Sequence, residues 1–500
     1  MSHHGAGNRP DLCGINLASC KSGLAAGSLL KDHYMKRLLF SILAFLPTGL
    51  LLAQQHPETH VTPAPQKAEN LLEAFERGQF HGSFRTFIMA TDNARQLTDY
   101  YAWAAGGSLH FVSAPWHGFN FGLGGVFNYN LSSSDLGTKD SLTGALNRYE
   151  IGLFDVERPD NRNDLDRIEE LFLRYQWKKS RITVGQQSLQ TPFVNYQDGR
   201  MRPTAESGAW LEYQEVKNLK VEGGWLWKIS PRSTVEWYSI GESIGLYPKG
   251  LNPDGTGSGY PEHLESKGIG LLGVTKNWGS NSKIQVWNQF VDNIFNTAFV
   301  QFDHVQPLKN DHKWILGAQF THQDALAHGG HTDASKTYFQ KGAQSNIISA
   351  QTGWEYGQWR ALAAYTHVTS EARFLSPREW GREPFYTFMQ RERVEGSGNS
   401  HSATARVQWQ NPKKRLKVEA AYGHFYLPDV KEVALNKYAF PSFNQFNFDV
   451  RYAFGGVLKG LRMQFLYVRK GLLGNVYGND RYVINKVQMS HYNLILNYVY

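Results

Sequence analysis

The chain has 500 residues, with 52 Lys and Arg against 44 Asp and Glu, 14% aromatic residues, 48 Gly and 2 Cys. So many aromatic side chains exclude a disordered chain, and two cysteines exclude a disulfide scaffold. The only long apolar run, residues 38–53, excludes a bundle of transmembrane helices, because each such helix needs about 20 mostly apolar residues. A polar chain rich in Gly and aromatic residues favours β-structure.

Residues 1–53 are expected to be removed as an upstream extension and a signal peptide. Basic Lys36 and Arg37 precede the apolar run that ends at Ala53, which is the pattern of a secretory signal. The first 34 residues are either an over-called start or a cytoplasmic extension. Both cysteines, Cys13 and Cys20, lie there, so the mature chain offers no thiol for catalysis, metal binding or a disulfide. The mature net charge is only mildly positive, which does not indicate nucleic-acid binding.

Residues 54–79 are predicted to be a periplasmic lead-in that ends in a short amphipathic helix, too small to plug a pore. From residue 80 onward the hydrophobic pattern has a period of two, which is the spacing of a β-strand. In segment 119–130, for example, Phe119, Phe121 and Leu123 alternate with polar residues or Gly. The pattern recurs at 416–422, 446–454 and 461–467, and the chain ends in it at Tyr500.

The connections between these segments alternate between short and long. Short polar turns are expected near 114–118, 178–180, 217–220, 279–282, 306–312, 356–358, 411–414 and 455–460. Longer links are expected near 92–101, 131–167, 188–206, 231–266, 293–297, 323–345, 368–400, 427–442 and 469–482. These connections predict an all-β, antiparallel transmembrane barrel over residues 80–500, with about 18 strands, short periplasmic turns and long external loops. The link near 293–306 decides between sixteen and eighteen strands.

Closure of the barrel follows from the membrane, because unpaired backbone groups in hydrocarbon cost several kcal/mol each. The first strand, near 80–91, is therefore expected to pair with the last, near 485–500. Aromatic residues close to the short turns fit a girdle at the periplasmic interface: Trp177, Trp278, Trp314, Tyr356, Trp359 and Trp409. Apolar side chains would face lipid while the hydrophilic set encircles water. The alternative is a soluble sandwich or propeller whose aromatic residues fill a core.

Basic residues on the polar faces of the strands form a candidate track along the lumen wall. These residues are Arg85, Arg174, Arg360, Arg406, Lys417, Arg451 and Arg462. A guanidinium group stays charged and binds carboxylates with two hydrogen bonds, so the track would favour entry of an anionic group. The alternative is that these charges only hydrate the lumen and form ion pairs with carboxylates there.

The third external loop is the candidate pore constriction. Pro192 and Pro203 bracket a stiff segment with apolar and charged residues, which indicates that the loop folds inward instead of being freely solvated. An ordinary packed surface loop is the alternative. The candidate constriction residues are Tyr196, Asp198, Arg200, Arg202 and Glu206.

At these residues the sequence resembles the OprD family of substrate-specific outer-membrane porins. The match lies in the Asp-x-Arg-x-x-Pro stretch formed by Asp198, Arg200 and Pro203, with Gly208 five residues on, and in the Gly-rich segment 118–124. The resemblance implies an eighteen-stranded monomeric channel that inward loops narrow, with a basic ladder on one wall. It also implies passive uptake of small carboxylate-bearing solutes. Arg202 and the loops around 131–167 and 368–400 depart from the family pattern.

The function expected is a substrate-selective diffusion channel in the outer membrane of a Gram-negative cell, with no catalysis, cofactor or metal. Its partners would be small anionic or zwitterionic solutes and outer-membrane lipid, and it would act as a monomer, with a trimer as the alternative. Two other functions remain open: a hydrolase carried on a barrel, and an adhesin or structural protein with a closed lumen. His328 and His331 could bind a metal, although a His-Gly loop is more often solvated.

Overall fold

The computed structural model describes residues 67–197 and 199–500. The expected signal peptide, its upstream extension and most of the lead-in lie outside this range. The strands are β1 Gln79–Asp92, β2 Tyr100–Val112, β3 Phe119–Ser133, β4 Arg167–Trp177, β5 Ser180–Gln187, β6 Ala205–Tyr213, β7 Leu219–Ser230, β8 Tyr238–Ser239, β9 Ile269–Trp278, β10 Ser282–Val291, β11 Phe295–Pro307, β12 Lys313–Ala325, β13 Gln344–Tyr356, β14 Trp359–Val368, β15 Ser400–Gln410, β16 Leu416–Tyr426, β17 Phe443–Ala453, β18 Leu461–Leu472 and β19 Met489–Val499. The helices are α2 Leu71–Glu76 and the 3-10 turns η1 Ile151–Leu153, η2 Lys309–Asp311, η3 Ala334–Lys336, η4 Gly456–Leu458 and η5 Asp480–Tyr482.

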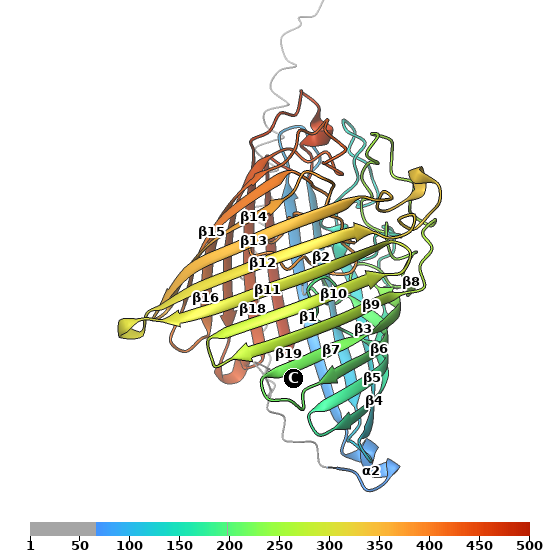
Figure 1. Cartoon of the computed structure of the whole chain (residues 1–500), viewed down its shortest axis with the longest axis vertical. Coiled ribbons are helices and arrows are strands. Elements are labelled where there is room, and N and C mark those ends of the chain that lie inside the picture. Colours follow the sequence, from blue (N-terminus) through green and yellow to red (C-terminus); the bar gives the residue numbers. More distant parts are fainter. Residues whose placement is uncertain (1–66, 198) are drawn as a thin grey trace, which may run out of the picture. The chain divides into compact units, whose positions relative to one another are not determined.

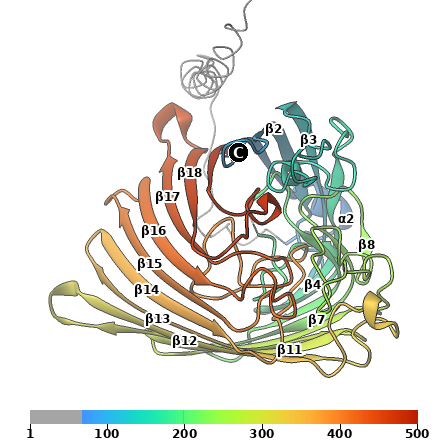
Figure 2. The same ribbon diagram turned by 90° about the horizontal axis from the view of Figure 1, so that it is seen from above.

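Within the described residues the strands close into an antiparallel barrel of 18 (Figures 1 and 2). Neighbours in sequence pair with one another, except that β7 pairs directly with β9, while the two-residue β8 pairs only with the end of β7. The last strand closes the ring: β1 pairs with β19 from Ser83 opposite Val499 to Asp92 opposite Ser490. The predicted architecture and its closure are confirmed. No helix in the described part of the chain is long and apolar enough to cross a membrane.

The connections match the expected alternation with one exception. Eight short turns join the strands at one end, and longer loops join most of them at the other. The link expected to be longer at 293–297 is instead a tight turn between Val291 and Phe295. Asn293 makes this turn with a φ of 63°, a left-handed conformation that Asn tolerates better than most residues. The tight turn keeps β10 and β11 separate, which fixes the strand number at eighteen.

The two faces of the wall follow the period-two pattern. On β4, Leu171, Leu173 and Tyr175 point outward and are exposed, whereas Phe172 and Arg174 point into the barrel. The outward face of the barrel is therefore apolar, as a surface in contact with lipid requires.

Helix α2 lies against the outside of the wall. Asn70 caps it by accepting a hydrogen bond from the N–H of Glu73. Phe75 packs on Phe111 of β2 and Phe121 of β3, with ring centroids 6.2 and 4.9 Å apart. Both partners lie on the outward face of their strands, so α2 lies against the lipid-facing wall and does not enter the lumen.

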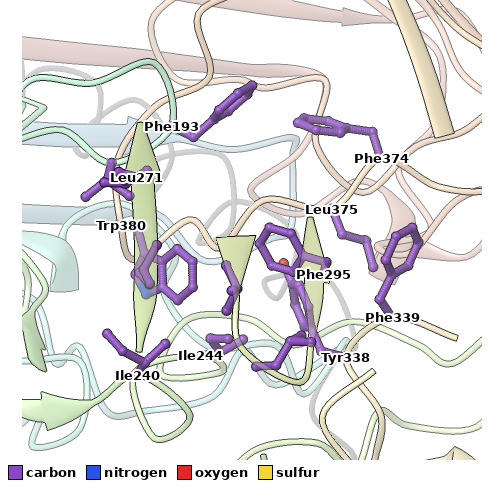
Figure 3. Packing of buried hydrophobic residues seen from close by; sticks show 14 of the residues in the cluster. Phe193, Ile240, Ile244, Leu271, Phe295, Tyr338, Phe339, Phe374, Leu375 and Trp380 are labelled. Atoms are coloured by element: carbon purple, nitrogen blue, oxygen red, sulfur yellow. The ribbon is translucent and has the colours of Figure 1, made fainter. Parts of the chain in front are cut away.

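Loops pack on the inner face of one sector of the wall and form a large hydrophobic core there (Figure 3), and smaller clusters lie on β1, β2, β16, β17 and β19. The wall side chains are Leu226, Ile229, Ile269, Leu271, Trp287, Val291, Phe295 and Phe299, and the loop side chains include Phe193, Ile240, Ile244, Tyr338, Phe339, Phe374, Leu375 and Trp380. Trp380 is 0% exposed, and its ring centroid lies 6.2 Å from that of Phe295. Its indole N–H donates to Ser243 Oγ at 2.8 Å. The expectation that the hydrophilic set encircles water does not hold for this sector, because apolar loop side chains cover the wall there.

Candidate solute-binding constriction

Two long loops, residues 188–204 and 369–399, meet inside the barrel, where Figure 2 shows loop segments crossing the ring. The Asn195 N–H donates to the Trp380 carbonyl at 3.0 Å, and its side-chain oxygen accepts the Arg382 N–H at 3.0 Å. A Cβ atom on Gly381 would lie 2.8 Å from the Asn195 backbone nitrogen, so only Gly permits this approach. The third loop therefore folds inward, and the loop at 369–399 is its main partner.

Buried ion pairs hold the loop at 369–399 against the wall. Lys470 on β18 is 0% exposed and lies 2.8 Å from Glu392, and Arg148 approaches the same carboxylate at 3.6 Å. Burial would raise the pKa of Glu392, but the neighbouring Lys470, Arg148 and Arg378 outweigh this effect and hold its pKa at about 2. Each partner compensates a charge that would be costly to bury alone.

Four arginines converge where these loops approach one another: Arg200, Arg232, Arg391 and Arg393. Burial lowers the pKa of Arg200 to about 9, and the next largest contribution comes from the Arg391 guanidinium. The pKa values of the other three arginines fall to about 10, first through burial, and Arg391 and Arg393 are lowered further by Arg232. All four side chains therefore stay cationic at neutral pH and lie close enough to repel one another.

The cluster has little compensating negative charge. No ion pair joins any of the four arginines to a carboxylate within residues 67–197 and 199–500. Arg200 Nε, Arg232 Nε and Nη1, and Arg391 Nε are buried without a hydrogen-bond partner. Other contacts are polar but neutral: Arg393 donates to Gln197 Oε1 at 2.8 Å, and Arg391 donates to Asn493.

The nearby carboxyl groups are occupied by other donors. Glu150 accepts from Thr91 and Asn147 side chains, Glu379 from the N–H groups of residues 245 and 247, and Glu383 from those of residues 394 and 395. Burial raises the pKa of all three, to about 7 for Glu383. They supply less negative charge than three ordinary carboxylates would.

The five constriction residues expected from the sequence occupy different environments. Arg200 joins the arginine cluster, and Tyr196 is 42% exposed in the same loop. Arg202 is 1% exposed and donates to the carbonyls of Leu165 and Phe154 at 2.6 Å each. Glu206 is 0% exposed and accepts the Leu189 N–H at 2.9 Å, while its other oxygen has no partner. Asp198 lies outside the described residues.

The expected basic track is mostly contiguous. Arg360, Arg406, Lys417, Arg451, Arg462 and Arg85 lie on β14, β15, β16, β17, β18 and β1, which follow one another around the ring with β19 between the last two. Arg174 on β4 lies apart from them and instead donates to Thr183 at 3.0 Å.

Several cations of this track form ion pairs with wall carboxylates. Glu419 lies 3.3 Å from Arg406 and 3.7 Å from Lys417, and Asp449 lies 3.0 Å from Arg451. The wall therefore carries a smaller net charge than its basic residues alone suggest. The arginine cluster in the loops is the less compensated of the two features.

Sequence analysis missed Arg232, Arg391 and Arg393. The segment 373–395 contains several arginines next to Trp380 and Phe385, which is the same mixture of basic and bulky apolar residues that identified the third loop. Applying that criterion to every long loop would have identified this segment as well. Which arginines meet depends on loop paths that no local pattern encodes.

The candidate metal-binding loop contains His328 and His331. No group of three or more His, Cys, Asp or Glu side chains in the described ranges is arranged to hold an ion. His331 instead accepts the Asp333 N–H at 3.0 Å.

Comparisons with known proteins agree with this geometry. Residues 75–400 match the model of the OprD family of outer-membrane porins. The chain belongs to the OprD family. It is thus a porin of the outer membrane, and the resemblance seen in its sequence is confirmed.

Solved porin structures share the fold at low sequence identity. OccAB2 of Acinetobacter baumannii is 13% identical with a TM-score of 0.66, over 86% of this chain and 99% of that one. OpdK of Pseudomonas aeruginosa, solved with vanillate, is 14% identical with a TM-score of 0.64, and the match covers 85% of this chain and 99% of OpdK. OccK9 (OpdG) of the same species is 16% identical with a TM-score of 0.63, and the match covers 85% of this chain and 99% of OccK9. No curated protein sequence is significantly similar to the chain.

Proposed function

We propose that this porin is a passive, selective channel for small carboxylate-bearing solutes, such as organic acids, amino acids or short peptides. The observation that carries the proposal is the cluster of Arg200, Arg232, Arg391 and Arg393, whose charges have no ion-pair partner among the described residues. Uncompensated buried charge is unfavourable for stability, so its retention indicates a ligand of opposite charge. OpdK, whose fold is similar, was crystallised with vanillate, itself a carboxylate.

In this proposal a solute meets two cationic regions in turn. Its carboxylate first replaces water at the arginine cluster, where guanidinium groups offer bidentate hydrogen bonds. The basic wall from β14 through β19 to β1 then offers weaker, partly ion-paired sites toward the short-turn end. Several weak sites in series let a solute leave as readily as it enters. Tyr196 and Asp198 are proposed to line the entrance, while Arg202 and Glu206 hold the third loop in place.

The proposal is tested with the purified protein in planar lipid bilayers. Discrete openings are expected, with a reversal potential in a KCl gradient that indicates a preference for anions. The Arg200→Gln variant is expected to reduce that preference about 2- to 5-fold, since one of four neighbouring cations is lost. Arg158→Gln is the matched control, because Arg158 pairs with Asp155 at 3.3 Å in another loop. A total absence of openings, or a preference for cations, would contradict the proposal.

The two other functions predict different results. We propose that the chain has no hydrolase activity, and incubation with labelled phospholipid and peptide substrates checks this directly. An adhesin with a closed lumen would give no swelling of liposomes in any small solute. Swelling in organic acids and amino acids is expected here.

We also propose that residues 1–53 are removed on export and that residues 54–79 remain as the lead-in to the barrel. N-terminal sequencing of protein isolated from the outer membrane would locate the cleavage site. A monomer is expected in mild detergent, and light scattering would distinguish it from a trimer.

A further inference from the structure

The arginine cluster carries more positive charge than a single carboxylate can balance. We propose that Arg200, Arg232, Arg391 and Arg393 form a site for a small solute with two carboxylates, in preference to a monocarboxylate or a zwitterion. This inference rests on the proposed function and narrows its substrate class.

The first argument is charge balance. Four cations lie together without an ion pair among the described residues, whereas one guanidinium suffices to neutralise one carboxylate. Asp198 lies outside the described residues, and even a full ion pair from it, together with an ionised Glu383 beside Arg393, would leave two positive charges. A monoanion would leave one of these charges buried and unbalanced, which a second carboxylate on the solute would neutralise.

The second argument is the supply of hydrogen-bond donors. The buried nitrogens without a partner are Arg200 Nε, Arg232 Nε and Nη1, and Arg391 Nε. Together they carry about five N–H bonds, which exceeds the roughly four acceptor positions of one carboxylate. Tyr247 lies next to Arg232 and raises its pKa, so a phenol is also near the site.

The third argument concerns zwitterions. The ammonium group of an amino acid would need an acidic acceptor beside the cluster. Glu150, Glu379 and Glu383 are the candidates, but each already accepts hydrogen bonds from at least two protein donors. Burial raises their pKa as well, to about 7 for Glu383. The site therefore suits a solute with two anionic groups better than a solute with an ammonium group.

Three four-carbon solutes separate these cases at similar size: succinate with two carboxylates, butyrate with one, and γ-aminobutyrate as the zwitterion. Each is added to single channels in planar bilayers at pH 7.5, and the concentration that halves the open-channel current is measured. Succinate is expected to act at a concentration at least 10-fold lower than butyrate, and γ-aminobutyrate at a concentration above that of butyrate. Equal values for succinate and butyrate would overturn the inference.

Inorganic phosphate serves as a second probe, because it is a mixture of the monoanion and the dianion at this pH and carries its charge on one centre. Weaker block by phosphate than by succinate is expected. Block by phosphate that equals or exceeds that by succinate would overturn the assignment to dicarboxylates.

Variants locate the effect in the cluster. Arg232→Gln and Arg391→Gln are each expected to raise the half-blocking concentration of succinate about 10-fold and that of butyrate less than 3-fold. Arg391→Lys keeps the charge but loses the bidentate geometry, so an intermediate shift is expected. Arg158→Gln is the control with the same loss of charge, and it should change neither value. An equal shift for both solutes in the cluster variants would contradict the inference.

The inference and the proposed function fail in different ways. Absence of channel openings, or absence of anion preference in KCl, defeats the proposed function itself. Anion-selective openings with equal block by succinate and butyrate defeat only the dicarboxylate assignment. If Arg391→Gln does not give the band of a folded barrel on a gel of unheated protein, which shifts on heating, Arg232→Gln alone decides the test.

Discussion

Two sectors of the same barrel wall differ in what covers their inner face. On β7 and β9 to β11 the inward side chains include Phe295 and Phe299, which loops cover and keep dry. On β15 to β17 the inward side chains include Arg406, Lys417 and Arg451, which are at least partly exposed. The first sector is a protein core along most of its inner face. The second keeps charged, partly exposed side chains toward the short turns and buries Phe425 and Phe443 toward the long loops.

The difference shows that apolar and polar residues alternate along a strand only where lipid covers its outer face and its inner face is not covered by apolar loop residues. β17 alternates cleanly, with Phe446, Phe448 and Val450 outward and Asn447 and Asp449 inward. β11 carries large apolar residues on both faces, since its inner face is buried under loops. A membrane strand without clean alternation thus indicates where loops fold into a barrel.

The largest effect is expected from breaking the loop-packed sector with Trp380→Ala. Trp380 belongs to the loop at 369–399 and is fully buried against Phe295 of the wall, and loss of a buried Trp typically costs about 3 to 5 kcal/mol. The loop should detach from the wall, so single-channel conductance and the rate of tryptic cleavage in the loop should both rise. Trp278→Ala is the control, because Trp278 is 52% exposed on the lipid-facing side. Unchanged conductance and cleavage in Trp380→Ala would show that the core does not hold the loop.

The next largest effect is expected where the loop meets β18, from Glu392→Gln. This change leaves Lys470 buried without its 2.8 Å partner, which costs about 3 to 5 kcal/mol in comparable buried pairs. The free energy of loop docking should fall, and increased current noise and loop cleavage would report this. The double variant Glu392→Leu with Lys470→Met removes both charges and should restore quiet openings; continued noise there would argue against the ion pair.

The same pair predicts an acid effect. The pKa of Glu392 is held at about 2, below the value of about 4.3 for a free Glu. A lowered pKa stabilises the docked loop above about pH 4, and this stabilisation is lost as the pH falls toward 2. The current noise of the native channel should therefore increase as the pH falls from about 4 toward 2.

The smallest effect is expected from Glu383, which lies beside Arg393. Its pKa is raised to about 7, first by burial, so it gains negative charge as the pH rises from 6 to 8. The anion preference of the channel should fall slightly over this range, because that charge offsets Arg393. Lys437 and Lys486, whose pKa values burial lowers to about 8 and about 7, lose charge in the same window.

Glu383→Gln separates these contributions in bilayer recordings at several pH values. The variant should show a shallower dependence of reversal potential on pH than the native channel. An identical dependence would assign the effect to the lysines.

Much of the fold and part of the site could be predicted from the sequence. Period-two alternation and the spacing of turns depend on neighbouring residues, so they located the eighteen strands and the pairing of the first strand with the last. The Arg200 segment was identifiable because prolines, aromatic residues and arginines are concentrated there. The tight turn at Asn293 was missed, since a single left-handed residue decided it.

The period-two hydrophobic pattern by itself determined that this chain forms a closed barrel with one apolar and one mostly polar face. The reason is that backbone pairing and contact with lipid act on every strand alike. The tertiary structure alone decided which loop residues meet inside it. Arg200 and Arg391 lie close enough to repel one another although about 190 positions separate them. Arg202, two residues from Arg200, instead donates hydrogen bonds to carbonyls of another loop. The physical reason is that burial of apolar residues fixes the path of each long loop, and this path then determines where the charged side chains of the loop lie.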